Sequence, residues 1–464
     1  MVATGGSQCG FCTPGILMRL TALAPEPSLR APGSPAAAAA SAKVRQALVA
    51  HLCRCTGWQT IEEAANQVFE GSTPHGGPPD RVRDLDAAST RAALEGGAPQ
   101  RVGPAVVLGR AGFADDTCPP GALVAVPDGE GGYAVGESVQ EARRAAGKVQ
   151  GRSTPVAPGS PVALPPGEWA LTLQTTWVEP GYLEPDASWC APGGEPASPL
   201  GNGGAFGGKR HSPVADDARR LADRYGRTVR VLWSREDVVR LGPKRPPVAG
   251  GIDAAGTGVL WVGVSGEGMT GDRWSSVLDQ VSSVAPGLVL ERVAVSGPPT
   301  AQDLRAAVWA EAAVLVAGAR VAGELGMRAC FGVPVEVVAP GGGRAVATCV
   351  SDECVEVVVD AGPAIDEVVL RSYCIGATHQ ALGWVRSEGV AVDAEGVVRD
   401  LTVRSFGILQ ARAMPRVSVV FEPSGDHGAV NGSDAVFAAV AAARWLAEGL
   451  PPSWPTDRAG AGRR

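Results

Sequence analysis

The sequence contains no run of 18 apolar residues, and its start has no charged segment followed by an apolar one. The first absence argues against a membrane-spanning helix and the second against a secretion signal. Basic clusters are also missing and the net charge is −7, which argues against nucleic acid or an anionic membrane as a partner. The five histidines are scattered, so no histidine metal site is predicted. We therefore expect a cytoplasmic protein.

Cysteine, in contrast, is well represented, with ten residues in 464. In a chain without a secretion signal, this number favours reduced thiols and metal ligation over disulfides. The 62 glycines and 38 prolines indicate many loops but stay below the level of a low-complexity chain. The length allows roughly three domains with a sizeable core.

Four of the cysteines form two close pairs near the N-terminus. Cys9 and Cys12 lie in the segment QCGFCTPG, and Cys53 and Cys55 lie in the segment CRCTGW. One helical hairpin between the pairs would bring the four thiols to one point, where they would bind a metal as thiolates. Thiolate quartets suit zinc as well as an iron–sulfur cluster, so this geometry leaves both open.

Residues 1–72 are predicted to form a small all-α domain. Apolar residues recur at helical spacing from Ile16 to Ala24 and from Ala36 to Leu52, and residues 61–69 give a third helix. Serine, proline, glycine and charged residues dominate the segment that follows, so a surface linker over residues 73–102 is expected.

Beyond the linker the pattern becomes α/β. Helices are predicted at residues 214–225, 303–325 and 433–448, the last of them apolar nearly all round and capped by Ser433 and Asp434. The expected fold class is therefore α+β and multidomain, with an all-α domain ahead of α/β domains. Short β-branched runs predict strands at residues 106–108, 123–126, 229–232 and 355–359.

The two cysteine segments resemble the second 2Fe–2S domain of the molybdenum hydroxylases, the family of xanthine dehydrogenase, aldehyde oxidase and carbon monoxide dehydrogenase. Trp58 stands where that family usually has tyrosine. The family carries a ferredoxin-like domain with its own cluster ahead of this one, whereas Met1 here opens only a few residues before Gln8, so we expect that cluster to be absent or to lie on another polypeptide. The resemblance implies that a 2Fe–2S cluster, rather than zinc, is bound by Cys9, Cys12, Cys53 and Cys55.

The rest of the chain resembles the large molybdopterin-binding portion of the same family. VLGRA at residues 107–111 resembles the entry to the α/β hammerhead domain, which is expected over residues 103–165. A shortened molybdopterin-binding domain is expected over residues 166–464. GGAFGGK at residues 203–209 resembles the family's GGGFGGK loop, whose lack of side chains lets backbone amides approach a bound group. By resemblance, the residues beside molybdopterin are Gly203, Gly204, Phe206, Gly207, Gly208 and Gln380.

The sequence also departs from the family pattern. The large portion is shorter than usual, and most of the stretch with the arginine–glycine loops that grip the cofactor is missing. The family's GxGE glutamate, which is the general base, has no counterpart, because residues 428–434 read GAVNGSD and no glutamate lies between Glu422 and Glu448. Asp434 is better suited to cap a helix than to act as a base. No catalytic residue is therefore predicted.

These features leave three hypotheses for function. The first is molybdopterin-dependent hydroxylation of a heteroaromatic or aldehyde carbon, with electrons leaving through the 2Fe–2S cluster. The second is a non-catalytic 2Fe–2S electron-transfer or scaffold subunit with a degenerate molybdenum domain, and the third is a zinc-stapled structural module. No FAD-binding portion is visible. The expected partner is therefore a ferredoxin-like 2Fe–2S subunit or an FAD-binding subunit, and a second copy of the chain is also considered.

Overall fold

The N-terminal segment is helical, as predicted. The short helix η1 (Val2–Thr4) is followed by α1 (Thr13–Thr21), α2 (Pro35–Leu48) and α3 (Gln59–Glu70). Helix α2 ends four residues earlier than expected. The three helices bury apolar side chains against one another, among them Ile16, Leu48 and Ile61. The computed structural model describes residues 1–23, 35–70, 83–147, 157–266, 269–326, 330–399, 401–422 and 427–457.

The expected linker contains a buried helix. Helix α4 (Leu85–Gly96) packs on a long helix near the C-terminus, α11 (Glu367–Arg386), through Ala88, Ala92, Val369 and Tyr373. The strand predicted at residues 106–108 is wrong, because Pro104 at the first turn instead begins the short helix α5 (Pro104–Val107). Three consecutive apolar residues are too short a run to distinguish a strand from a helix.

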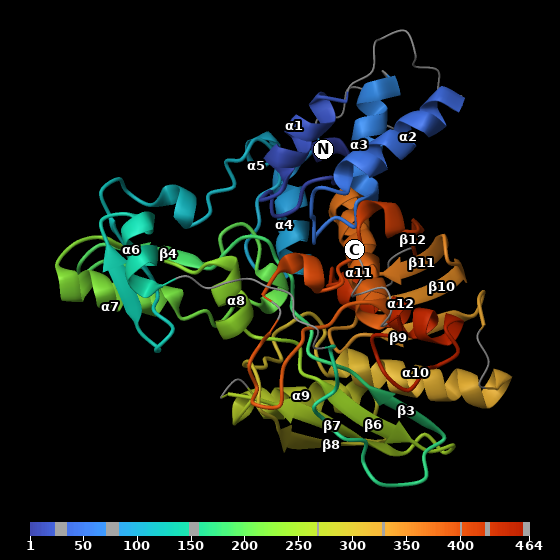
Figure 1. Cartoon of the computed structure of the whole chain (residues 1–464). Coiled ribbons are helices and arrows are strands. Elements are labelled where there is room, and N and C mark those ends of the chain that lie inside the picture. Colours follow the sequence, from blue (N-terminus) through green and yellow to red (C-terminus); the bar gives the residue numbers. More distant parts are fainter. Residues whose placement is uncertain are drawn as a thin grey trace.

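The first sheet lies between two short helices at one side of the molecule (Figure 1). Its strand order is β2-β1-β5-β4, with β1 and β5 parallel and the outer pairs antiparallel. The strands predicted at residues 123–126 and 229–232 are thus confirmed as β1 and β5. The elements of this unit are η3 (Asp115–Thr117), β1 (Leu123–Pro127), β2 (Tyr133–Gly136), α6 (Val139–Ala146), β4 (Ala187–Cys190), η4 (Ala205–Gly207), α7 (Val214–Tyr225) and β5 (Val229–Leu232).

The second sheet has the order β3-β6-β7-β8 and is covered by helices from the middle of the chain. Helix α10 starts six residues later than expected, because Ala306 and Val308 adopt positive φ angles of 53° and 73° that interrupt a helix. The elements here are β3 (Leu171–Gln174), α8 (Arg235–Leu241), β6 (Val248–Ile252), β7 (Gly258–Val264), α9 (Asp272–Val284), β8 (Leu288–Ala294) and α10 (Trp309–Leu325).

The third sheet, of order β12-β11-β10-β9, packs on the most buried helix of the chain, α12 (Ser433–Ala447). The strand predicted at residues 355–359 is confirmed as part of β11. Helix α12 also contacts α10 and α11, so the core of the molecule lies around it (Figure 1). The remaining elements are β9 (Pro334–Val338), β10 (Arg344–Ser351), β11 (Cys354–Asp360), η5 (Val403–Ser405), η6 (Ala411–Ala413) and β12 (Arg416–Phe421). None of the described helices is long and apolar enough to cross a membrane.

A buried histidine on α11 makes the fold sensitive to acid. Burial lowers the pKa of His379 to about 4, while its ring Nε2 lies 2.9 Å from the carbonyl oxygen of Leu409. Between an unfolded pKa of about 6.5 and the folded value, the unfolded chain binds more protons, so stability falls as the pH falls through this window. We expect a loss of roughly 3 kcal/mol by pH 4 from this group.

The measurement is the urea midpoint at pH 7.5 and pH 5 for the wild type and for His379→Gln. The variant should show the smaller difference between the two pH values. His211→Gln, at a half-exposed histidine beside Asp303, should leave the wild-type difference unchanged. An equal pH dependence in His379→Gln and the wild type would contradict the expectation.

Candidate functional site

The structure brings the four N-terminal cysteines together. Cys9 precedes α1 and Cys12 is its N-cap, whereas Cys53 and Cys55 lie in the loop between α2 and α3. The Sγ atoms of Cys9 and Cys55 are 3.6 Å apart, and the thiols of Cys12 and Cys53 are close enough to shift each other's pKa. Gly10, at a φ of 86°, supplies the turn that presents the first two thiols on one side of the chain.

The thiols form two pairs rather than a single tetrahedron. Among the described residues, no three cysteine, histidine or acidic side chains converge on the position of one metal ion. A structural zinc needs four ligands around one point. A 2Fe–2S cluster needs four thiolates shared between two irons, so two adjacent pairs match the cluster better.

The pKa values of Cys12 and Cys53 diverge. The hydrogen bond from the Cys12 thiol lowers the pKa of Cys53 to about 6, and the same bond raises the pKa of Cys12. The pair therefore holds one proton firmly. The hydrogen bond to Cys9 and burial raise the pKa of Cys55, so a bound cation is needed to favour the thiolate form of these buried sulfurs.

One face of α11 supports the loop that carries Cys53 and Cys55. A Cβ added to Gly376 would lie 1.8 Å from the carbonyl oxygen of Cys55, so only glycine allows this approach. The side chain of Gln8 donates to the same carbonyl at 3.0 Å and to the hydroxyl of Ser372 at 2.9 Å. Ser372, Gly376 and Gln380 are spaced by four, and the Nε2 of Gln380 donates to the carbonyl of Arg54 at 3.2 Å.

A buried ion pair also fixes the loop that carries Cys53 and Cys55. The guanidinium of Arg54 donates to both carboxylate oxygens of Glu388, at 2.6 and 2.7 Å, and through Nε to the carbonyl of Pro180 at 2.9 Å. Both side chains are almost fully buried. Desolvation raises the pKa of Glu388, and the charge of Arg54 opposes that rise.

The glycine-rich loop over residues 203–208 lies beside the cysteines. Ala205 and Phe206 both have positive φ angles, 51° and 55°, which is a strained state for residues with a side chain. A Cβ on Gly207 would lie 1.7 Å from the carbonyl oxygen of Asp303, and one on Gly208 would lie 2.7 Å from the ring of Tyr182. These glycines are therefore required by contacts with the protein itself.

A cavity of about 40 Å³ separates the cysteines from this loop. The Nε2 of Gln100 has no hydrogen-bond partner among the described residues, although its Oε1 accepts from Tyr373 at 2.5 Å. The space holds a few water molecules as it stands. The lining includes Gln8, Cys9, Cys12, Cys55, Gln100, Gly203, Gly204, Phe206 and Tyr373.

A larger cavity of about 300 Å³ lies on the other side of Phe206. The guanidinium of Arg305 lies 5.1 Å from the Phe206 ring centroid and pairs through Nε with Asp434 at 3.1 Å. Its Nη1 is buried and has no hydrogen-bond partner among the described residues. Asp303 and Arg210 also line this polar space.

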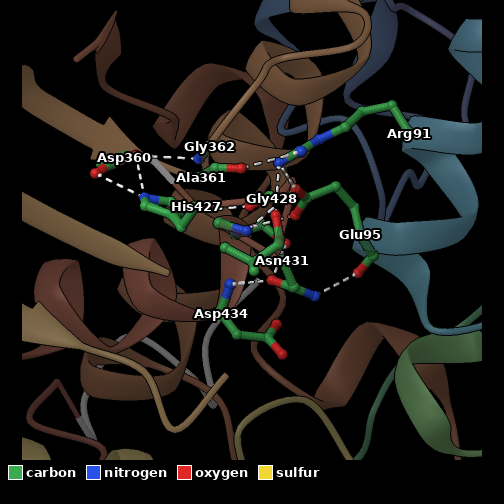
Figure 2. Close-up of polar contacts among 12 residues, drawn as sticks. Arg91, Glu95, Asp360, Ala361, Gly362, His427, Gly428, Asn431 and Asp434 are labelled. Atoms are coloured by element: carbon green, nitrogen blue, oxygen red, sulfur yellow. Dashed lines mark hydrogen bonds and ion pairs between the residues drawn. The ribbon is translucent and has the colours of Figure 1, made fainter. Parts of the chain in front are cut away.

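The start of α12 is occupied by a carboxylate from α4. Figure 2 shows Glu95 reaching from α4 to the loop that precedes α12. Its two oxygens accept from the backbone N–H groups of Gly432 and Ser433 at 3.1 and 2.9 Å, and Arg91 pairs with it. The cap expected from Ser433 and Asp434 is wrong, because the helix begins at Ser433 and Asn431 accepts from the N–H of Asp434 at 3.0 Å.

The sequence-predicted site residues are thus divided among three places. Gly203, Gly204 and Phe206 share the small cavity with the cysteines, and Gly207 faces the larger one. Gly208 packs on Tyr182, and Gln380 contacts the cysteine loop. Sequence reasoning missed the supporting side chains because they belong to no spaced motif, namely Gln8, Glu95, Gln100, Tyr373 and Glu388.

Comparison with known proteins supports the resemblance. Residues 1–66 match the 2Fe–2S binding domain family. Xanthine dehydrogenase of Emericella nidulans is 50% identical over 63 residues, which are 13% of this chain and 4% of that protein. The iron–sulfur-binding subunit of xanthine dehydrogenase from Escherichia coli O157:H7 is 40% identical over 58 residues, 12% of this chain and 32% of that one. The chain therefore spans only a small part of these relatives.

The likeness in structure extends further along the chain. Aldehyde oxidoreductases from Desulfovibrio gigas and Desulfovibrio desulfuricans match with TM-scores of 0.60 and 0.61, at 13% identity, over 97% of this chain and 90% of theirs. The expected α+β multidomain fold is confirmed by this match. The resemblance to the molybdenum hydroxylase family is confirmed in sequence for residues 1–66 and in fold for the chain as a whole.

Removing one partner of the buried Arg54–Glu388 ion pair should lower the stability of the protein. Glu388→Gln leaves the Arg54 charge buried without a counter-charge, so we expect a loss of about 3–5 kcal/mol in stability, measured as the shift of the urea midpoint. Replacing both residues, as Arg54→Met with Glu388→Gln, should recover part of the loss.

The matched control is Glu336→Gln at the half-exposed pair with Arg344. It should cost less than about 1 kcal/mol. An equal loss in Glu388→Gln and in the control would show that the buried pair does not hold the loop.

Proposed function

We propose that this chain, which has a 2Fe–2S binding domain of the molybdenum hydroxylase type and the fold of an aldehyde oxidoreductase, is an iron–sulfur oxidoreductase. In this proposal the cluster passes single electrons between a redox group in the neighbouring cavity and a partner protein. The observation that carries it is the cavity itself, which Cys9, Cys12 and Cys55 line on one side and Gly203, Gly204 and Phe206 on the other.

The four cysteines are the proposed ligands of the cluster. The 3.6 Å contact between Cys9 and Cys55 supports one iron on this pair, and the neighbouring thiols of Cys12 and Cys53 support the second. The Thr56 hydroxyl lies 3.2 Å from the Cys53 sulfur. Hydrogen bonds to ligand sulfurs tune the reduction potential of such a cluster.

Molybdopterin is the proposed group in the cavity, by resemblance to the family. The mostly apolar lining with a few polar groups fits such a ring system, because the unpartnered amide of Gln100 and the side-chain-free backbone of Gly203 and Gly204 offer hydrogen-bonding groups to it. The free volume of about 40 Å³ is too small for the ring, so Phe206 and its loop must move outward to admit it. When bound, the group supplies the chemistry that hydroxylates a heteroaromatic or aldehyde carbon with oxygen from water.

A second candidate is a non-catalytic electron-transfer subunit. The observation that favours it is the role of Glu95, whose two oxygens are already engaged by Gly432, Ser433 and Arg91 at the start of α12. Both oxygens of this carboxylate already serve the start of the helix, and breaking those bonds would leave buried N–H groups unpaired. Loss of a general base typically slows a reaction by about 10²–10⁴-fold.

The partner and location remain part of the proposal. A ferredoxin-like 2Fe–2S subunit or a flavin-binding subunit would complete the electron path, as in the separate iron–sulfur-binding subunit of the bacterial relative. Reduced, metal-binding thiols suit the cytoplasm.

Metal content tests the two candidates and zinc together. Protein purified anaerobically should contain two irons and two acid-labile sulfides per chain, with an EPR signal after reduction by dithionite, as four thiolates imply. Molybdenum in addition, after co-expression with cofactor-biosynthesis proteins, would support the hydroxylase. The cluster without molybdenum would support the electron-transfer subunit, and zinc without iron would contradict both.

The pairing of the thiols has its own test. Cys9→Ser and Cys55→Ser should give the same change in the EPR g-values, because each places one oxygen ligand on the same iron. Cys12→Ser and Cys53→Ser should give a second, common change. Cys118→Ser, at a cysteine outside the site, should leave the spectrum unchanged. Four unrelated spectra would contradict the pairing.

A further inference from the structure

Several large apolar side chains are exposed next to the cysteines. Phe11 is 42% exposed, Met18 is 73% exposed and Leu108 is 62% exposed. Isolated apolar residues on a surface are normal, whereas a contiguous group at a functional site indicates a contact surface. These three side chains would make such a contact surface if they are contiguous.

Local geometry joins them. Pro14 and Met18 are four residues apart on α1 and share one face of it. A Cβ added to Gly109 would lie 3.2 Å from Cγ of Pro14, so the residue after Leu108 packs on the start of α1. Phe11 meets Phe113 edge to face at 5.7 Å between ring centroids. Figure 1 shows α1 and α5 side by side, and Phe11, Pro14, Met18 and Leu108 are called the cluster-side patch below.

This patch lies on the solvent-facing side of the candidate cluster site. Phe11 lies between Cys9 and Cys12 in sequence, and Cys12 is the N-cap of the helix that carries Met18. The inner side of the same cysteines faces the cavity beside the glycine loop. Since electron transfer weakens steeply with distance, the patch is the place where a protein outside the chain would come nearest to the cluster.

Exposed arginines predominate beside the patch on its α1 and α5 side. Arg19, Arg101 and Arg110 are exposed, and residues 1–23 and 101–110 contain no carboxylate side chain, whereas Asp115 and Asp116 follow Phe113 on the side of Phe11. The chain as a whole carries a net charge of −7, so this basic rim is local. An apolar centre with a rim mainly of one charge is typical of a protein interface, and its complement is an acidic surface.

We infer that the cluster-side patch docks a small, acidic, one-electron carrier protein. The inference rests on the proposed 2Fe–2S cluster. In the step itself one electron leaves the reduced cluster and reduces the oxidised centre of the carrier. No bond forms or breaks and no proton moves. The apolar centre excludes water at the contact, and the arginines raise the rate of encounter with an acidic partner.

The test measures electron transfer from the full chain, reduced with dithionite and desalted, to an oxidised acidic 2Fe–2S ferredoxin by stopped-flow absorbance. At low ionic strength, Arg19→Glu with Arg110→Glu should lower the second-order rate at least about tenfold, because steering contributes about 10–10³-fold to association. Added salt should slow the wild type and bring the two rates together. Basic cytochrome c as acceptor should react faster with the variant.

Met18→Gln with Leu108→Gln should slow the ferredoxin reaction while its salt dependence persists. The control for net charge is Arg143→Glu with Arg144→Glu, two exposed residues of α6, which should change the rate less than about twofold because they lie away from the contact.

Equal slowing by the α6 control, or an unchanged rate in both patch variants, would overturn the inference. Dissociation of a dimer by the patch variants in sedimentation experiments would overturn it in favour of a second copy of the chain. Failure of the proposed function is separate, since the wild type itself would then lack the EPR signal of the reduced cluster.

Discussion

The close approach of the Cys53–Cys55 loop to helix α11 is the contact on which the rest of the site depends. Gly376 has no room for a Cβ beneath the carbonyl of Cys55. Arg54 lies between the two cysteines and is held by Glu388, which follows the C-terminal end of α11. A buried ion pair of this kind stabilises little in net terms, because desolvation offsets most of the attraction. It does fix position, since any shift of the loop would leave one of two charges buried and unpaired. The cysteines are thereby held at a set distance from the large domains.

The sequence was sufficient for features that depend on spacing. Two cysteine pairs on either side of a helical hairpin, and four glycines within six residues, specify their local geometry almost completely. Glu95 and Gln100 were not predictable, because they lie in a segment whose proline, glycine and charge content is typical of a linker, and only the long-range fit of α4 on α11 makes it a helix. The cap of α12 was missed for the same reason, as the capping carboxylate is more than 300 residues away in sequence.

The start of α12 shows how a carboxylate from a distant part of the sequence can stabilise a buried helix. The N-terminus of a helix that is buried on all sides must satisfy its free N–H groups without water. Where the family has a glutamate of its own in this loop, this chain has Asn431, Gly432 and Ser433, and Glu95 supplies the acceptors instead. The interaction is favourable for the helix dipole and for the N–H groups. The same bonds occupy both carboxylate oxygens of Glu95, which suits the stability of the helix.

Phe206 connects these observations, because it lines both the cavity at the cysteines and the larger polar cavity at Arg305 and Asp303. The backbone at Ala205 and Phe206 stores strain of about 1–3 kcal/mol per residue, which persists only where surrounding contacts enforce it. Those contacts are made by the two glycines that follow, Gly207 and Gly208, which press against Asp303 and Tyr182 with no space for a side chain. The loop therefore cannot relax by a local turn. A group that enters between the cysteines and this loop has to displace the Phe206 ring, and in doing so it would join the two cavities into one.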